Sequence, residues 1–337
     1  MRSFIAPPTT DEVVPGPVPT FSVVISAYQV ADFIEETVRS ALEQTAPPLE
    51  VIVCDDGSTD GIGDVLEPFR DRITFIRQEN RGPGAAKNAA AALASGDFIA
   101  LLDGDDIYHP NRLEALGMMA AARPDLDVLN ADSLVEARGK VIRRQYDETW
   151  AFDVDDQRSA ILDRCFILGH AAVRRRRFVE VGGFDEDLVV DDWDLWVRII
   201  LGGSSAGHVP EPLSRYRVRE ESLSTRRVAI CDACVRLLER AAERDDLSDK
   251  ERVALERSLR SWRRDLALAE VRSELIEGGQ AIRRKLLRVA TMPGVGFRTR
   301  LKLVVTAIAP RIVGRVAAAR TRERWQGAAG VWLSSEQ

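Results

Sequence analysis

The sequence predicts an α/β protein, in which an open, mainly parallel, twisted sheet flanked by helices is followed by a helical C-terminal extension. Three observations support this fold class. From Phe21 onward, short apolar runs rich in β-branched residues alternate with amphipathic stretches of helical period. Several runs end directly in polar residues, as buried parallel strands do at their ligand-binding edge. From about Thr225 the pattern becomes helical and stays so.

The first part of the pattern alternates regularly, which implies right-handed crossovers between parallel strands. The predicted order is strand 21–27, helix 32–44, strand 49–54, a helix through 65–69, strand 73–77, helix 83–95 and strand 98–102. The later part is less regular. It predicts a helix to 123, strand 127–131, a hairpin 133–145 turning near Gly139, a helix near 155–164, an extended segment 165–173, helix 191–201 and short strands 206–209 and 213–218.

The 337 residues are enough for one large domain with an appendage or for two domains. We expect a flexible leader at 1–19, which holds five prolines, a sheet domain at 20–224 and a basic helical extension at 225–337. No apolar run approaches the ~18 residues of a membrane span, and the N-terminus lacks a hydrophobic signal core. The four cysteines form no paired framework, which favours a reducing, cytoplasmic location.

The most informative stretch is Asp103-Gly104-Asp105-Asp106, which directly follows the apolar run 98–102. Three carboxylates crowded at a strand end repel one another unless a cation offsets them. Hard oxygen ligands suit Mg²⁺ or Mn²⁺ held together with substrate phosphates. The alternative is a solvated Asp/Gly turn. The other strand ends, at 26–28, 55–56 and 80–81, are also polar, so we expect all four to converge on one rim.

Six motifs in order resemble the family 2 glycosyltransferases over roughly residues 20–222. They are Ser26-Ala27-Tyr28-Gln29, Asp-Asp-Gly-Ser-Thr-Asp at 55–60, the segment Asn80–Asn88, Asp103-Gly104-Asp105, Gly-Gly-Phe-Asp-Glu at 182–186 and Asp191-Asp192. Three positions depart from the family pattern: Gln29 replaces Asn, Lys87 replaces Arg, and Arg219 stands where His is frequent. The resemblance implies the GT-A fold, a Rossmann-like nucleotide-binding arrangement.

The resemblance also implies residue roles. Asp192 would be the catalytic base and Asp105 the metal ligand, with Asp103 as a ribose or second metal contact. The donor would be bound by Ser26, Ala27, Tyr28, Asp56, Lys87, Asp103, Gly104 and Arg217, with Asp191 and Asn88 as further candidates. Each has a structural alternative, such as strand-end packing for Tyr28, turn and cap duty for Asp56, a surface ion pair for Arg217 and helix capping for Asp191.

Two further expectations concern the acidic cluster and the histidines. The mutual repulsion of the three carboxylates at 103–106 should be relieved only when metal and donor bind together. Asp106 should act as a local cap for the residues that follow it. His170 and His208 lack ligand-like spacing and are expected to be structural or exposed.

These roles imply a metal-dependent (Mn²⁺ or Mg²⁺), inverting transfer of one sugar from a nucleotide-diphospho-sugar. UDP is favoured through the resemblance, and the acceptor would be a glycan or a lipid-linked hydroxyl in cell-surface polysaccharide or glycoconjugate synthesis. The Gln-x-x-Arg-Trp motif of processive synthases is missing, which favours a single transfer. Two alternatives stay open, a nucleotidyltransferase and a non-catalytic nucleotide-sugar binder. The second would have no need of Asp192.

The C-terminal segment is strongly basic, with twelve Arg and Lys residues between 283 and 324 against the single Glu323, whereas the whole chain carries −6. Residues 297–316 also follow an apolar helical pattern. This combination predicts that 281–325 binds an anionic membrane surface, at the inner face of the plasma membrane. The alternative is a helical pair folded onto the acidic body or onto a second copy in a homo-oligomer. No nucleic-acid partner is expected.

Overall fold

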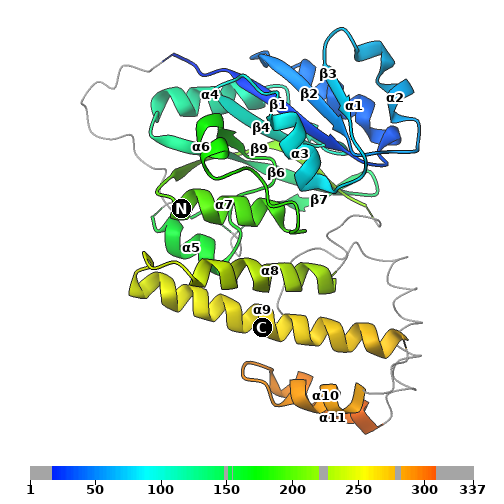
Figure 1. Cartoon of the computed structure of the whole chain (residues 1–337), viewed down its shortest axis with the longest axis vertical. Coiled ribbons are helices and arrows are strands. Elements are labelled where there is room, and N and C mark those ends of the chain that lie inside the picture. The colour runs from blue at the N-terminus through cyan, green and yellow to red at the C-terminus, as the bar shows by residue number, and fades with distance from the viewer. Residues whose placement is uncertain (1–16, 148–150, 154, 220–226, 278–281, 309–337) are drawn as a thin grey trace.

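The computed structural model describes residues 17–147, 151–153, 155–219, 227–277 and 282–308. One nine-stranded sheet runs in the order β3-β2-β1-β4-β8-β6-β9-β5, with β7 paired to β6. The strands are β1 (Phe21–Ala27), β2 (Glu50–Asp55), β3 (Thr74–Arg77), β4 (Phe98–Asp103), β5 (Ile107–Tyr108), β6 (Leu126–Ala137), β7 (Lys140–Arg144), β8 (Ala172–Arg174) and β9 (Ser205–Val218). The α/β fold class is confirmed (Figure 1).

Helices lie on both faces of this sheet, and further helices follow it. Their bounds are α1 (Ala31–Leu42), α2 (Ile62–Val65), the 3-10 helix η1 (Glu67–Phe69), α3 (Pro83–Ala91), α4 (Arg112–Ala122), α5 (Gln157–Asp163), α6 (Arg175–Glu180), α7 (Asp191–Leu201), α8 (Arg227–Ala242), α9 (Asp249–Glu277), α10 (Ile282–Ala290) and α11 (Phe297–Ile308). Among the described helices, none combines the length and the apolar composition that a membrane crossing requires.

The sheet is parallel in its first half and mixed in its second. β1 pairs in parallel with both β2 and β4, and β3 pairs in parallel with β2. This register sets Ser26 beside Asp103, so the polar ends of these strands lie at one edge. β8 then runs antiparallel to β4 and β6, while β9 is parallel to β6. One long, irregular β9 replaces the two short closing strands expected at 206–209 and 213–218.

The core consists of two layers, one on each face of the sheet, because successive strand side chains point to opposite faces. On one face Val23 and Ile25 pack with α1, α2 and α4. On the other face Val24 packs with α3, α5, α6 and α7, and this cluster continues without a break into α8 and α9 through Leu237 and Leu255. The first two helices of the C-terminal part therefore share the core of the sheet unit.

The remaining helices form a smaller cluster at the end of the chain's described part. Leu286 of α10 and Leu303 of α11 pack with Val271 of α9. Residues 1–16 of the predicted leader and 309–337 of the predicted basic segment lie outside the described residues, so those two expectations remain predictions. All four cysteines are free thiols.

Candidate active site

The polar strand ends open into a cavity of about 1710 Å³. Every predicted site residue except Asn88 lines it: Ser26, Ala27, Tyr28, Asp56, Lys87, Asp103, Gly104, Asp105, Asp191, Asp192 and Arg217. The structure therefore brings together residues up to 191 positions apart in the sequence. The predicted convergence of the strand ends is confirmed as geometry, while the roles of the residues remain proposals.

The chain after β4 is held against β1 by close backbone contact. The Gly104 amide donates to the Ser26 carbonyl at 2.9 Å, and a Cβ at residue 104 would lie 2.9 Å from that same oxygen. No larger side chain fits there without moving β1. The Ser26 hydroxyl in turn donates to Asp103 Oδ1 at 3.3 Å. This contact fixes where the acidic cluster enters the cavity.

Each carboxylate of the 103–106 cluster faces a basic side chain from another part of the chain. Lys87 Nζ lies 3.5 Å from Asp103 Oδ1, and Arg219 Nε lies 2.6 Å from Asp105 Oδ2. His170 Nε2 lies 2.5 Å from Asp106 Oδ2. The expectation that only metal and donor relieve the repulsion is therefore wrong, because the cations Lys87 and Arg219 already pair with Asp103 and Asp105, and the His170 ring contacts Asp106.

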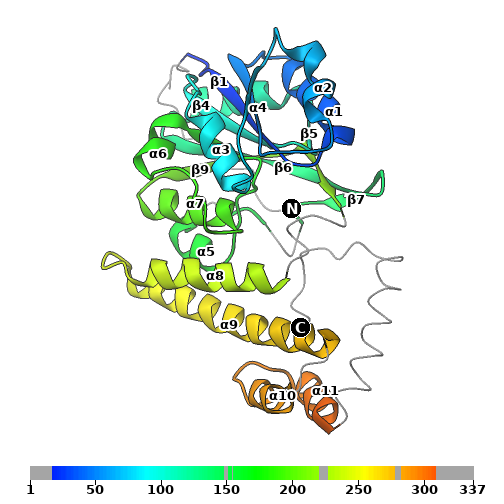
Figure 2. The ribbon, with the colours of Figure 1, turned by 45° about the vertical axis from the view of Figure 1, so that its right-hand side comes forward.

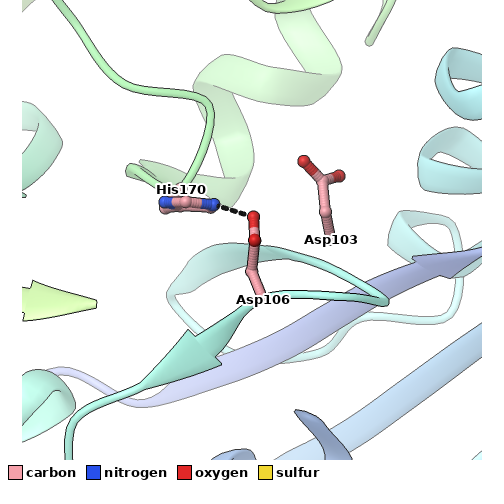
Figure 3. A group of neighbouring side chains, drawn as sticks. All are labelled: Asp103, Asp106 and His170. Atoms are coloured by element: carbon pink, nitrogen blue, oxygen red, sulfur yellow. Dashed lines mark hydrogen bonds and ion pairs between the residues drawn. The ribbon is translucent and has the colours of Figure 1, made fainter. Parts of the chain in front are cut away.

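Asp106 is not the local cap that the sequence suggested. It is fully buried, and its Oδ1 accepts from the backbone amide of Arg217 at 2.7 Å, while its Oδ2 faces the ring of His170 (Figure 3). His170 is buried, as expected for a structural residue, but it also lines the cavity. No spacing in the sequence predicts the contact between Asp106 and His170. It forms because β8 is antiparallel to β4, so the residues before β8 lie beside those after β4.

The surroundings of Asp103 and Asp105 shift the pKa values of these two carboxyl groups in opposite directions. Burial raises the pKa of Asp103, but the charges of Lys87 and His170 lower it more, so the net shift is downward. Burial and the neighbouring carboxylates raise the pKa of Asp105 to about 7, although Arg219 opposes this change. Asp105 thus holds its charge less readily than Asp103.

The second acidic group lies at the N-terminus of α7. Lys87 is buried, and its Nζ also lies 3.2 Å from Asp191 Oδ2, so one ammonium bridges β4 and α7. Burial lowers the pKa of Lys87, but the charges of Asp103, Asp191 and Asp192 raise it far more. Lys87 therefore stays protonated. The expectation of a cation at this position is supported by this bridge.

Asp192 has the environment of a general base. Its Oδ1 accepts from the Trp193 amide at 2.7 Å, and a Cβ at Gly169 would lie 3.4 Å from its Oδ2. Burial and then the Asp191 charge raise its pKa to about 6, with Lys87 opposing them. A carboxylate that titrates near neutral pH can both accept and release a proton.

Two of the predicted donor-binding residues, Asp56 and Arg217, already have partners inside the chain. Asp56 accepts from Gln78 Nε2 at 2.7 Å and from the amides of Arg81 and Gly82. Arg217 contacts Glu36 and donates to the Asp105 carbonyl at 3.1 Å. These bonds leave a carboxylate such as Asp56 about one further acceptor position for a ligand.

Asn88 lies outside the cavity wall. Its side chain donates to the Phe184 carbonyl and accepts from the Phe184 amide, which clamps the loop before α7. A Cβ at Gly183 would lie 2.6 Å from Asn88 Oδ1. Asn88 thus positions Asp191 and Asp192 through this loop.

The residues of the cluster fit a divalent cation. Ligand atoms of Asp103, Asp106 and His170 all lie within 4.8 Å of one another (Figure 3). Asp106 is fully buried and each of its oxygens already faces a partner, the His170 ring or the Arg217 amide, whereas the Asp103 side chain is 37% exposed. The accessible oxygens are therefore those of Asp103 and, once Arg219 moves, of Asp105, the hard donors that Mg²⁺ and Mn²⁺ prefer.

Solved structures with similar folds identify the fold of this chain. A mannosyltransferase from Pyrobaculum calidifontis, solved with GDP-Man and Mn²⁺, aligns with a TM-score of 0.59 at 21% identity, covering 93% of this chain and 89% of that one. TarS 1–349 of S. aureus, solved with UDP-GlcNAc, aligns with a TM-score of 0.61 at 19% identity, covering 90% and 92%. The fold is that of the GT-A glycosyltransferases.

Sequence relatives give the family. Residues 22–182 match the model described as glycosyl transferase family 2, so this part of the chain belongs to that family. Chondroitin synthase of Escherichia coli is 37% identical over 135 residues, 38% of this chain and 19% of its own length. The putative glycosyltransferase EpsH of Bacillus subtilis is 27% identical over 218 residues, 62% of this chain and 63% of its own. The chain spans less than two thirds of both relatives. The predicted resemblance to this family is confirmed.

Proposed function

We propose that the protein is a metal-dependent, inverting hexosyltransferase that moves one sugar from a nucleotide-diphospho-sugar to an acceptor hydroxyl. The observation that carries this proposal is the arrangement of two acidic groups on one cavity, with Lys87 between them. Lys87 pairs with Asp103 of the first group and with Asp191 of the second, and Asp192, whose pKa is raised, is the next residue along α7. Different residues would therefore activate the donor and remove the acceptor proton, and all of them line the same cavity.

At the donor end, the bond between the anomeric carbon and the diphosphate oxygen breaks, and the diphosphate leaves as an anion. Lys87 supplies a fixed positive charge that is already bound between carboxylates and needs no reorganisation. Asp103 and Asp105 would hold Mn²⁺ or Mg²⁺, which supplies Lewis-acid stabilisation of the leaving diphosphate.

At the acceptor end, the hydroxyl oxygen forms the new bond to the anomeric carbon and its proton passes to Asp192. The Trp193 amide holds one carboxylate oxygen of Asp192, which leaves the other oxygen to accept that proton. A base that acts on the side opposite the leaving group gives in-line displacement, and therefore inversion at the anomeric carbon.

A UDP-sugar donor and a role in polysaccharide synthesis are the finer parts of the proposal. UDP is supported by the similarity to TarS, solved with UDP-GlcNAc, although the similar mannosyltransferase was solved with GDP-Man. Polysaccharide synthesis is supported by the relative named chondroitin synthase.

A thermal-shift panel tests the donor class. UDP-, GDP- and dTDP-sugars are measured with and without Mn²⁺ on the full chain. A ligand at 100 times its Kd stabilises the folded state by about 2.7 kcal/mol. We expect one nucleotide to raise the melting temperature in a Mn²⁺-dependent way. A panel in which no nucleotide sugar shifts the transition would contradict the proposal.

Arg219 is expected to compete with the metal for Asp105. Because its guanidinium pairs directly with Asp105 Oδ2, Arg219→Ala removes a competing cation and frees a ligand oxygen. We expect Mn²⁺ affinity without nucleotide to rise roughly tenfold, or about 1.4 kcal/mol. Free Mn²⁺ is measured by electron paramagnetic resonance during titration. Arg215→Ala, on the preceding strand β9 and paired with Glu136, is the matched control. Equal Mn²⁺ affinity in all three proteins would argue against metal binding at Asp105.

We further propose that α10 and α11 dock the enzyme on an anionic membrane surface at the cytoplasmic face. Phe297 is 80% exposed, and Leu301, Val304 and Val305 continue its exposed stripe along α11. Residues 282–308 contain seven Arg and Lys side chains and no acidic one. Exposed apolar residues flanked by cations match an interface of anionic headgroups over acyl chains. The part of this segment beyond residue 308 lies outside the described residues.

Vesicle co-sedimentation checks this surface. The double variant Arg298→Glu/Lys302→Glu reverses two exposed charges on α11, each worth about 1 kcal/mol at an anionic surface. We expect binding to phosphatidylglycerol vesicles at low salt to fall more than tenfold, while neutral phosphatidylcholine vesicles bind neither protein. Arg263→Glu on the exposed side of α9 is the control. Unchanged sedimentation of the double variant would exclude α11 as the docking element.

A further inference from the structure

The cavity extends past Asp192 into a part whose wall comes from the C-terminal helices. Asp163 at the end of α5 and Arg227 of α8 line this part together with Ser258, Trp262 and Asp265 of α9. α8 and α9 cross below α5 and α7 in both views (Figures 1 and 2), and α9 packs against α5. The proposed donor-binding residues come from the sheet, its connecting segments and α7. One end of the cavity is therefore lined by these elements, and the other end is lined mainly by α8 and α9.

Asp192 lies between these two ends. On the donor side, its carboxylate interacts electrostatically with Lys87 and Asp103. On the other side, its charge adds to the burial that raises the pKa values of Cys165 and of Cys234 on α8. A ligand in the part lined by α8 and α9 would therefore reach the base from the side away from the acidic cluster.

The side chains of this second part suit a sugar ring. The Trp262 indole is partly buried and tilted against Trp193, with ring centroids 5.8 Å apart, so its position is fixed by packing. A rigid aromatic face beside carboxylates and hydroxyls offers both an apolar surface for the C–H face of a pyranose and acceptors for its hydroxyls.

The charges of the second part are largely compensated within the chain. Arg257 lies 2.9 Å from Asp163, and Arg227 lies 3.5 Å from Asp265. Paired charges leave little net field for an ionic headgroup, whereas they still offer hydrogen-bonding groups. A neutral ligand is therefore favoured over a phosphorylated one.

We infer that α8 and α9 form the acceptor subsite, in which Trp262 carries a neutral sugar ring that presents its hydroxyl to Asp192. This inference rests on the proposed function and adds to it the substrate class and the residues that select it. It also gives the C-terminal helices a part in catalysis, since they would position the acceptor.

Saturation-transfer difference NMR on the full chain tests the subsite. The probes are methyl glycosides of glucose, galactose, mannose and N-acetylglucosamine, measured with Mg²⁺ and either UDP or GDP. We expect saturation of at least one glycoside in the wild type, at least a fivefold loss in Trp262→Ala and retention in Trp262→Phe. The nucleotide signal in the same sample should change less than twofold. Arg263→Ala, next to Trp262 but outside the cavity wall, should behave as the wild type.

The outcomes separate this inference from the proposed function. If the nucleotide binds and no glycoside receives saturation, or if Trp262→Ala retains the glycoside signal, the inference is overturned and the proposed function stands. If neither UDP nor GDP binds, both are overturned. Should Trp262→Ala fail to fold, Asp265→Ala decides, with the exposed Asp232→Ala of α8 as control: loss of the glycoside signal supports the subsite, and retention overturns it.

Discussion

Asp192→Asn is expected to lower the rate of sugar transfer by about 10²–10⁴-fold, the usual contribution of a positioned general base. The amide has nearly the shape of the carboxylate but cannot take the acceptor proton. Nucleotide-sugar binding should change less than twofold, because the donor contacts lie on the other side of Lys87. Steady-state kinetics, with nucleotide affinity measured by calorimetry, separate these effects.

The pH profile gives an independent check. Because the pKa of Asp192 is raised to about 6, the base is protonated below that pH and the rate should fall as pH decreases through 6. The acidic limb of the profile should be lost in Asp192→Asn. Asp232→Asn, an exposed carboxylate of α8, is the control and should keep both rate and profile. Unchanged turnover in Asp192→Asn would show that Asp192 is not the general base.

Lys87→Met is expected to destabilise the fold by about 3 kcal/mol at pH 7. Removing one partner of a buried ion pair leaves an uncompensated charge and usually costs about 3–5 kcal/mol. The lower end applies here because Asp103 is partly exposed, while Asp191 is buried. Urea denaturation measures the free energy of unfolding. Lys250→Met, which removes an exposed lysine paired with Asp156, should leave the free energy of unfolding nearly unchanged.

The destabilisation should depend on pH with a defined sign. The pKa of folded Asp103 is lowered from 3.8, so its contribution to stability is present above pH 3.8 and is lost as pH falls through the folded value. Without Lys87 that lowering is largely lost. The difference between the wild type and Lys87→Met should therefore shrink as the pH falls below 3.8. A difference that grows on acidification would show that Lys87 does not act through these carboxylates.

The sequence alone determined the sheet half that carries the donor residues. Strands 21–27, 49–54 and 98–102 were predictable because an apolar run ending in polar residues is a local signal, and the C-terminal ends of parallel strands meet at one edge. The motifs at 55–60 and 103–105 also lie within single turns. Family and candidate residues could therefore be read without any knowledge of long-range contacts.

Only the tertiary structure decided how the charges are paired and which helices close the cavity. Arg219 and His170 compensate Asp105 and Asp106 from 114 and 64 residues away, through β9 and the antiparallel β8. The pairing of α9 with α5, which brings Trp262 to the cavity, depends on apolar faces whose partners no local pattern specifies. Local periodicity encodes each element. The free energy of burying those elements against one another selects the distant side chains that meet.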